Sequence, residues 1–265
     1  MPDQKNFKFK CSLIFELAKA DFKKRLAGSY FGMLWMFVQP IVTVVIYYMV
    51  FTVIGGRGQQ QFMDGVPYLL WMICGLVPWF YFSECLSGGT SCLLEYSYLV
   101  KKVVFRIDIL PMVKIGSALV VHGIFAAILL TVSLFCGNLP QASWLQILYY
   151  SGCTAVLALG IVKFTSAAVV FFRDMSQLVA IAIQFGVWLT PVMYSNSQIP
   201  WAPVAFILRL NPMYYVAEGY RDSIIRGVWF WEKSETIYFW AVTLLLFWFG
   251  NHMFKKLRPH FADVL

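Results

Sequence analysis

Glu84 and Lys163 are ionisable side chains within long apolar segments of this 265-residue chain. Glu84 belongs to segment 66–87, and Lys163 belongs to segment 144–172. A charge at membrane depth is costly unless it is paired or faces a polar cavity. We therefore predict an intramembrane pair of Glu84 and Lys163, or a polar cavity that they face. The alternative is that Lys163 extends its ammonium group to the nearer membrane surface.

The histidines and cysteines lack the spacing of a catalytic or metal site. His122 and His252 have no cysteine or carboxylate at ligand spacing, and the six cysteines form no Cys-x-x-Cys pair. We predict packing or interfacial roles for them, and no metal and no catalytic residue. HExxH, GxSxG and GxxxxGK[ST] motifs do not occur, so any nucleotide that drives this protein must bind another chain.

The composition is that of a protein in lipid. Hydrophobic residues make up 60% of the chain and charged residues 13%, with a mean hydropathy of +0.69. A soluble domain carries about 25% charged residues. Several apolar runs reach the roughly 20 residues that cross a hydrocarbon core. The fold class that follows is an all-α polytopic membrane protein.

Six apolar segments are predicted to be transmembrane helices, at 33–54, 66–87, 109–136, 144–172, 177–194 and 236–254. Between the last two, residues 195–235 hold two short apolar runs that are interrupted by prolines. Each run is too short to span, so we predict an external re-entrant helical hairpin there. A small folded loop domain is the alternative.

The distribution of basic residues predicts the orientation. With six spans, fourteen Lys and Arg residues fall on the side of both termini and five fall on the opposite side. Cytoplasmic loops carry the excess of positive charge. Both termini are therefore predicted to be cytoplasmic, with 195–235 outside.

Residues 7–30 are predicted to form an amphipathic interface helix before the first span. Ile14, Ala18, Phe22 and Leu26 recur every four residues, and lysines occupy much of the remaining surface. This pattern suits the headgroup region of a membrane. A cleavable signal peptide fits poorly, because the next apolar stretch is too long and five more spans follow. Gly28 and Gly32 provide either a bend or a close helix contact.

Several sequence blocks, in this order, carry a family resemblance. They are "RLAGSYFGMLWMFVQP", "FFRDMSQL", "LTPVMYS", "LNPMYYVAEGYRDSIIRG" and "FKKLRPHFADVL". Over essentially its whole length the chain resembles the permease subunit of type-2 ABC transporters. The most similar branch exports O-antigen, capsular, rhamnan-type or teichoic acid polysaccharides, so the resemblance implies that residues 1–265 form a single transmembrane domain.

The resemblance implies partners and a substrate. The permease would form a homodimer with two ATP-binding subunits, which hold the ATP and Mg, and would carry no cofactor itself. The substrate would be a polysaccharide linked to polyprenyl diphosphate, moved from the cytoplasm across the bacterial plasma membrane. No nucleic acid is expected as a partner.

The resemblance also implies roles for residues on the cytoplasmic side. The lipid diphosphate or the membrane interface would meet Lys23, Lys24, Arg25, Gly28, Ser29 and Tyr30. Basic residues at an interface attract phosphate, although they also serve as ordinary topology anchors. The loop at 88–108 would dock on the ATPase through Glu95, Tyr96, Tyr98, Lys101 and Lys102, with a second contact at Arg173 and Asp174.

Two further sets of residues belong to the export path that the resemblance implies. Aromatic residues that would line a sugar conduit are Tyr47, Tyr48, Trp71, Trp79 and Tyr81; the alternatives are core packing or a membrane-interface belt. An outer gate at 199–227 would include Asn211, Pro212, Tyr214, Tyr215 and Gly219.

Two other functions compete with polysaccharide export. One is an exporter of the same family that moves a drug or a lipid. The other is an integral-membrane acyltransferase or glycosyltransferase, for which His122 and Glu84 would be weak catalytic candidates. An ATPase gene next to this one would favour the exporter.

Overall fold

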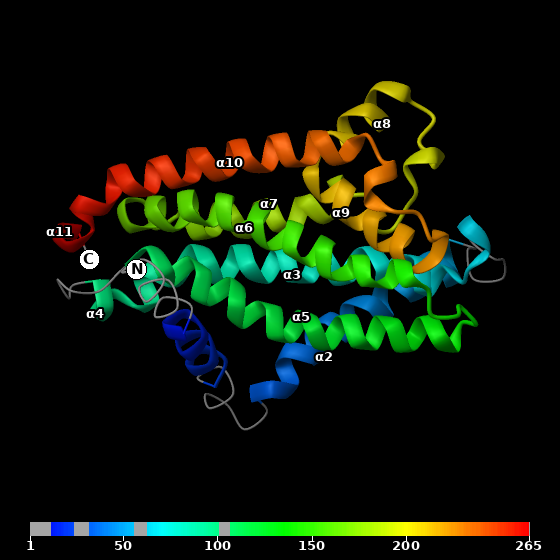
Figure 1. Cartoon of the computed structure of the whole chain (residues 1–265), viewed down its shortest axis with the longest axis horizontal. Helices are drawn as coiled ribbons and strands as arrows, with labels where there is room; N and C mark the ends of the chain where they lie inside the picture. The colour runs from blue at the N-terminus through cyan, green and yellow to red at the C-terminus, as the bar shows by residue number, and fades with distance from the viewer. Residues whose placement is uncertain (1–11, 24–31, 56–62, 101–106, 265) are drawn as a thin grey trace, which may run out of the picture.

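The computed structural model describes residues 12–23, 32–55, 63–100 and 107–264, and every regular element in these ranges is helical (Figure 1). Within these ranges five helices are long and apolar enough to cross a membrane, and each coincides with a predicted span. They are α2 (Gly32–Met49) with the π-helical turn Val50–Ile54, α3 (Tyr68–Glu95), α5 (Leu110–Phe135), α6 (Gln146–Phe171) and α10 (Glu235–Leu257). The all-α prediction is thus confirmed.

The predicted fifth span is a shorter apolar helix, α7 (Met175–Leu189), of 15 residues. At 1.5 Å per residue it is about 22 Å long, which is less than a hydrocarbon core of about 30 Å. Pro191 explains its end, because the residue before a proline avoids the helical region, and Thr190 has a ψ of 125°. Residues 190–193 continue as buried, non-helical backbone.

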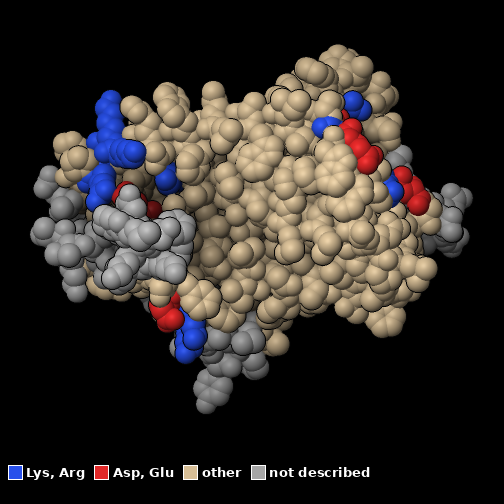
Figure 2. All heavy atoms as spheres, viewed as in Figure 1, with Lys and Arg blue, Asp and Glu red and all other residues tan. Residues whose placement is uncertain are grey.

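Short helices lie at the two opposite ends of the bundle (Figure 1). One end holds the helix at 12–23, α4 (Ser97–Val100) and α11 (Phe261–Val264). The other end holds α8 (Ala202–Arg209), α9 (Pro212–Arg221) and the π-helical turn Asp222–Arg226. In Figure 2 the charged side chains gather toward these ends and leave a broad uncharged band between them. This band has the surface character of a membrane-embedded bundle.

Helix α3 lies at the centre of the bundle and packs against α5, α6, α7 and α9. It continues to Glu95, whereas the sequence predicts a span that ends at Ser87 and a loop from Gly88. The glycines do not end the helix here, because Gly89 lies in its contact with α6. A Cβ atom on Gly89 would lie 2.6 Å from a methyl carbon of Val162. The predicted loop at 88–108 is therefore helical over its first eight residues.

Helices α6 and α10 form the most extensive helix pair of the described chain and cross at two glycines. A Cβ atom on Gly250 would lie 2.0 Å from the carbonyl oxygen of Gly160. Small residues at a crossing allow helix backbones to approach closely in a membrane. This crossing fixes the position of α10 on the bundle.

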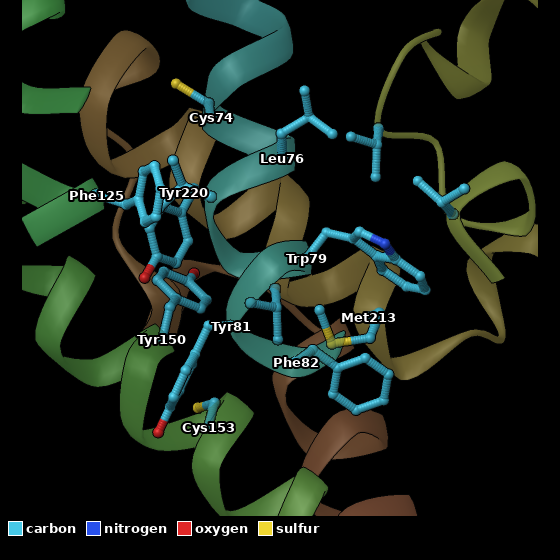
Figure 3. Close-up of a cluster of buried hydrophobic side chains, with 14 of the residues drawn as sticks. Cys74, Leu76, Trp79, Tyr81, Phe82, Phe125, Tyr150, Cys153, Met213 and Tyr220 are labelled. Atoms are coloured by element: carbon cyan, nitrogen blue, oxygen red, sulfur yellow. The ribbon is translucent and has the colours of Figure 1, made fainter. Parts of the chain in front are cut away.

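Buried aromatic rings from three helices form much of the core (Figure 3). Tyr81 of α3, Tyr150 of α6 and Tyr220 of α9 gather on one side of α3. Trp79 and Met213 lie on the other side. Helix α9 is therefore packed into the bundle core rather than laid over its end.

Candidate functional site

A cavity of about 550 Å³ lies between α2, α3, α5 and α7. Its size falls within the range of about 300–1,000 Å³ that is usual for ligand pockets. The hydrogen-bonding residues that line it include Gln39, Thr43, Ser83, Glu84, Ser87 and His122. The aromatic residues are Trp35, Phe80, Tyr81 and Phe125. The lining therefore combines flat apolar surfaces with polar groups.

Glu84 lines this cavity, but its predicted pairing with Lys163 is not formed. Lys163 Nζ donates to Asn251 Oδ1 at 2.7 Å, and it lies 4.8 Å from the centroid of the Phe247 ring. No hydrogen bond or ion pair between described residues joins Lys163 to Glu84. Lys163 is 7% exposed, so it does not extend to the surface of the protein either. Asn251 and Phe247 belong to α10, so this lysine forms part of the α6–α10 contact.

His122 belongs to a buried triangle of polar groups beside the cavity. Its Nε2 atom lies 2.8 Å from Tyr220 Oη and 2.9 Å from Ser151 Oγ, and the two hydroxyl oxygens are 2.8 Å apart. The ring of Tyr81 stacks on the imidazole, with centroids 4.5 Å apart. The triangle joins α5, α6 and α9. The sequence prediction of a packing role for His122 did not include these hydrogen bonds.

The aromatic residues predicted to line a conduit lie in different environments. Trp71 and Trp79 are buried inside the single chain, which is the packing alternative. Tyr81 is also buried and lines the cavity. Tyr47 is half-buried and Tyr48 is exposed. Of the five residues, only Tyr47 and Tyr48 offer their rings at the surface of this chain.

The non-helical backbone after α7 takes hydrogen bonds from two other helices. Tyr68 Oη, from α3, donates to the carbonyl oxygen of Met193 at 2.8 Å. Arg221 Nη2, from α9, donates to the carbonyl oxygen of Val192 at 2.8 Å. Irregular backbone is tolerated at membrane depth where protein surrounds it and provides such partners.

Arg221 is a fully buried cation with several partners. Its guanidinium carbon lies 3.4 Å from the centroid of the Trp71 ring, and its Nη1 pairs with the Glu218 carboxylate. Its Nε also points to the carbonyl oxygen of Trp71 at 3.4 Å. Buried charges in proteins need pairing of this kind. The residue thus joins α3, α9 and the segment after α7.

Arg226 extends this charge cluster toward the protein surface at this end of the bundle. Its Nε donates to Asp64 Oδ2 at 2.9 Å, and its Nη1 donates to Glu218 Oε2 at 2.7 Å and to Asp222 Oδ1 at 3.0 Å. Burial alone would raise the pKa of Glu218, but the charges of Arg221 and Arg226 outweigh it. The net effect is a pKa below the ordinary value for a glutamate. The cluster therefore holds Glu218 ionised between two arginines.

The start of α9 is fixed by Asn211 and Pro212. Asn211 caps the helix, because its Oδ1 accepts a hydrogen bond from the backbone N–H of Met213 at 3.0 Å. Its Nδ2 donates to Thr190 Oγ1 at 2.8 Å. Pro212 occupies the first turn, where a missing N–H costs little. Of these two predicted gate residues, Asn211 connects the start of α9 to the end of α7.

The other predicted gate residues face the core to different extents. Tyr215 is buried and its hydroxyl lies 2.9 Å from Thr236 Oγ1, whereas Tyr214 is half-buried. Gly219 packs directly on a ring of α6, since a Cβ atom there would lie 2.1 Å from Tyr150. The structure thus places these residues together on α9.

At the opposite end of the bundle, Lys114 joins the N-terminal helix to α3. Its Nζ donates to Asp21 Oδ1 at 2.8 Å and to Glu95 Oε2 at 2.7 Å. Tyr96 Oη donates to the same Asp21 oxygen at 2.6 Å. Burial, and then the Asp21 carboxylate, raise the pKa of Tyr96. Of the residues predicted to contact an ATPase, Tyr96 thus contacts the N-terminal helix directly, and Glu95 is linked to it through Lys114.

The remaining residues predicted at this end are exposed or lie outside the described residues. Lys23, Tyr98, Arg173 and Asp174 are exposed. The residues that lie outside the described part of the chain are Lys24, Arg25, Gly28, Ser29, Tyr30, Lys101 and Lys102.

Sequence reasoning missed the partners that connect the helices. It counted Arg221 only as one of the positive charges that predict the orientation. It assigned no partner to Asp21, Lys114 or Asp64. Lys114 lies six residues into a predicted span that otherwise carries no charge, and this isolation was a signal of a buried pair.

The helical bundle, its uncharged band and its buried ion pairs define a multi-pass membrane protein. A model of the ABC-2 type transporter family matches residues 12–225, so the chain belongs to that family. An O-antigen export system permease protein RfbA of Klebsiella pneumoniae is 26% identical over 269 residues, which cover 98% of this chain and 97% of the relative. An O-antigen export system permease protein RfbA of Myxococcus xanthus is 27% identical over 254 residues, covering 95% and 94%.

Proposed function

We propose that this chain is the membrane-spanning permease subunit of an ATP-driven exporter of polysaccharide. The cargo would be a glycan carried on polyprenyl diphosphate and moved out of the cytoplasm across the plasma membrane. The observation that carries the proposal is similarity over nearly the full length to O-antigen export permeases of two organisms. A drug or lipid cargo, or a transferase activity, has no comparable support.

In this proposal α7 and the buried segment after it together form the fifth of six spans. The helix at 12–23 lies along the inner membrane surface, and both termini are cytoplasmic. Helices α8 and α9 form the external re-entrant hairpin and act as the outer gate. The excess of Lys and Arg on the side of the termini supports this orientation.

Two ATP-binding subunits would dock at the inner end. The exposed ring of Tyr98 and the exposed turn at Arg173 and Asp174 support such a docking surface. A movement of this surface would then reach the N-terminal helix through Lys114, because its ammonium group pairs with both Glu95 and Asp21. ATP and Mg would be bound by the partner subunits alone.

A second copy of this chain would pack against α2 and α7. Both faces present apolar side chains outward, including Ile46 of α2, Val53 of the π-helical turn that follows it, and Phe185 and Trp188 of α7. The rings of Tyr47 and Trp188 lie 6.1 Å apart, so the two faces form one surface. A glycan conduit would lie between the two copies, beside Tyr47 and Tyr48.

The test is export in the cell of origin after deletion of this chain. We expect polymer to accumulate inside the deletion strain and to reach the surface when the wild-type chain is restored together with its ATPase. A Walker-motif lysine variant of the ATPase is the control, and it should leave the polymer inside. Normal surface polymer in the deletion strain would contradict the proposal.

A further inference from the structure

Two hydroxyl groups of the cavity between α2 and α3 are left with acceptor capacity only. Thr43 Oγ1 already donates to the carbonyl oxygen of Gln39 at 2.8 Å, and Ser83 Oγ donates to that of Trp79 at 2.8 Å. A hydroxyl has one hydrogen and two lone pairs, so each oxygen can only accept a further bond. A molecule in the cavity that forms a hydrogen bond with either oxygen must therefore supply the donor.

Glu84 lies beside Ser83 on α3 and lines the same cavity. An ionised carboxylate is acceptor-only and offers about four lone-pair positions, so it can accept additional donors whatever other groups it contacts. The polar wall formed by Thr43, Ser83 and Glu84 thus matches a ligand rich in hydroxyl or amine hydrogens.

Flat apolar surfaces complete the lining. Trp35, Phe80 and Phe125 contribute aromatic rings to the cavity. A sugar ring has hydroxyl groups at its edge and C–H groups on its faces, so it can donate to acceptors and pack on an aromatic ring at once. An acyl chain would leave the polar wall unpaired. A diphosphate would bring acceptors to face acceptors.

We propose that this cavity is a sugar-binding subsite within a single copy of the permease. It would hold one or two sugar residues of the polymer, apart from the basic residues that meet the lipid diphosphate. The inference rests on the proposed function and adds a place where the glycan binds before or during its passage.

The test is photo-crosslinking in cells that make the polymer. Phe80 is replaced by p-benzoylphenylalanine, which keeps an aromatic ring at the cavity. The matched control places the same residue at Phe249 of α10, which is 43% exposed and does not line the cavity. Irradiated permease is purified and probed for glycan by periodate labelling, and for lipid by mass spectrometry.

We expect glycan-bearing adducts from position 80, none from position 249, and loss of the adducts in cells that cannot make the polymer. Lipid adducts alone at position 80, or no adduct there, would overturn the inference. Export is measured in the same cells with the wild-type chain. Failed export contradicts the proposed function, whereas normal export without a glycan adduct contradicts only this subsite.

A second measurement tests the acceptor wall without relying on a bulky probe. Thr43→Val keeps the shape of the side chain and removes the acceptor oxygen. We expect export to slow at least fivefold while the amount of permease in the membrane stays the same. The control is Thr131→Val, because Thr131 is exposed and makes the same local bond, to Ala127 O at 2.9 Å, away from the cavity. Equal export by the two variants would count against the subsite.

Discussion

Lys114 Nζ lies between Asp21 Oδ1 and Glu95 Oε2, at 2.8 and 2.7 Å, so one ammonium group joins the N-terminal helix to the end of α3. Lys114 and Asp21 are almost fully buried, while the Glu95 side chain is 41% exposed. Removing one partner from a buried pair leaves an uncompensated charge, which is more costly than losing the pair itself.

Lys114→Met should therefore destabilise the protein by about 3–5 kcal/mol, because Asp21 stays buried without its cation. We expect Asp21→Asn with Lys114→Met to cost less than the sum of the two single changes. The measurement is unfolding in mixed micelles, followed by tryptophan fluorescence. Arg258→Met is the matched control: its pair with Asp108 is at 2.9 Å but is over 40% exposed on both sides, so it should change stability by less than about 1 kcal/mol.

Gly250→Ala should disturb the α6–α10 crossing, because the added Cβ would lie 2.0 Å from the carbonyl oxygen of Gly160. Overpacking of this kind costs about 1–3 kcal/mol. The same unfolding assay measures it. Gly123→Ala is the control, since a Cβ there meets no atom within 4 Å and alanine is the better helix former. Equal stability of the two variants would show that the helices separate without cost.

Acid should weaken the charge cluster of Arg221, Arg226 and Glu218 through protonation of Glu218. The folded protein lowers the pKa of this carboxyl below its ordinary value, because Arg221 and Arg226 outweigh the opposing effect of burial. Its contribution is therefore complete above the unfolded pKa of about 4.3 and is lost as the pH falls through the lower, folded value. Proteolysis of the outer segment, compared between pH 6 and pH 3.5, measures this change.

Glu218→Gln should reduce the acid sensitivity of that segment, since the group no longer titrates. Glu232→Gln is the control, because Glu232 is exposed and has no ion pair among the described residues. An unchanged pH profile in the Glu218 variant would mean that another group causes the acid response.

Changes at His122 and Tyr220 should be coupled. Each hydrogen bond in the triangle contributes about 0.5–1.5 kcal/mol net, and an orphaned buried partner adds a further penalty. The double variant His122→Leu with Tyr220→Phe should cost less than the sum of the two single variants, by at least about 0.5 kcal/mol, as is usual for residues in contact. The control is Tyr238→Phe combined with His122→Leu. These two changes should be additive, because Tyr238 donates to Leu210 O and does not belong to the triangle. Additive effects of the His122 and Tyr220 substitutions would show that the hydrogen bonds of the triangle do not couple these two residues.

Hydropathy was sufficient to locate most of the long helices. The predicted spans 109–136 and 144–172 agree within two residues with α5 and α6. This agreement follows because the length of an apolar run is a local property of the sequence. The second span was cut short at Gly88, since the packing of Gly89 on Val162 depends on a helix far along the chain.

Pairing between helices could not be predicted from one sequence. Lys163 lies on Asn251 rather than Glu84, because the rotation of each helix about its axis decides which side chains meet. Hydropathy does not set this rotation when a helix is apolar on all sides. For the same reason the burial of Trp71 beneath Arg221 was not foreseen.

The contacts of Arg221 restrict how the outer end of the molecule can move. A movement of α9 alone would separate this guanidinium from the Trp71 ring and from the Val192 carbonyl oxygen. The cation would then lose these partners in an apolar interior. The lower-energy motion carries α9, the chain after α7 and the adjoining part of α3 together as a single rigid unit. Any opening at this end of the bundle then behaves as a tilt of whole helices, and not as a hinge motion of α9 alone.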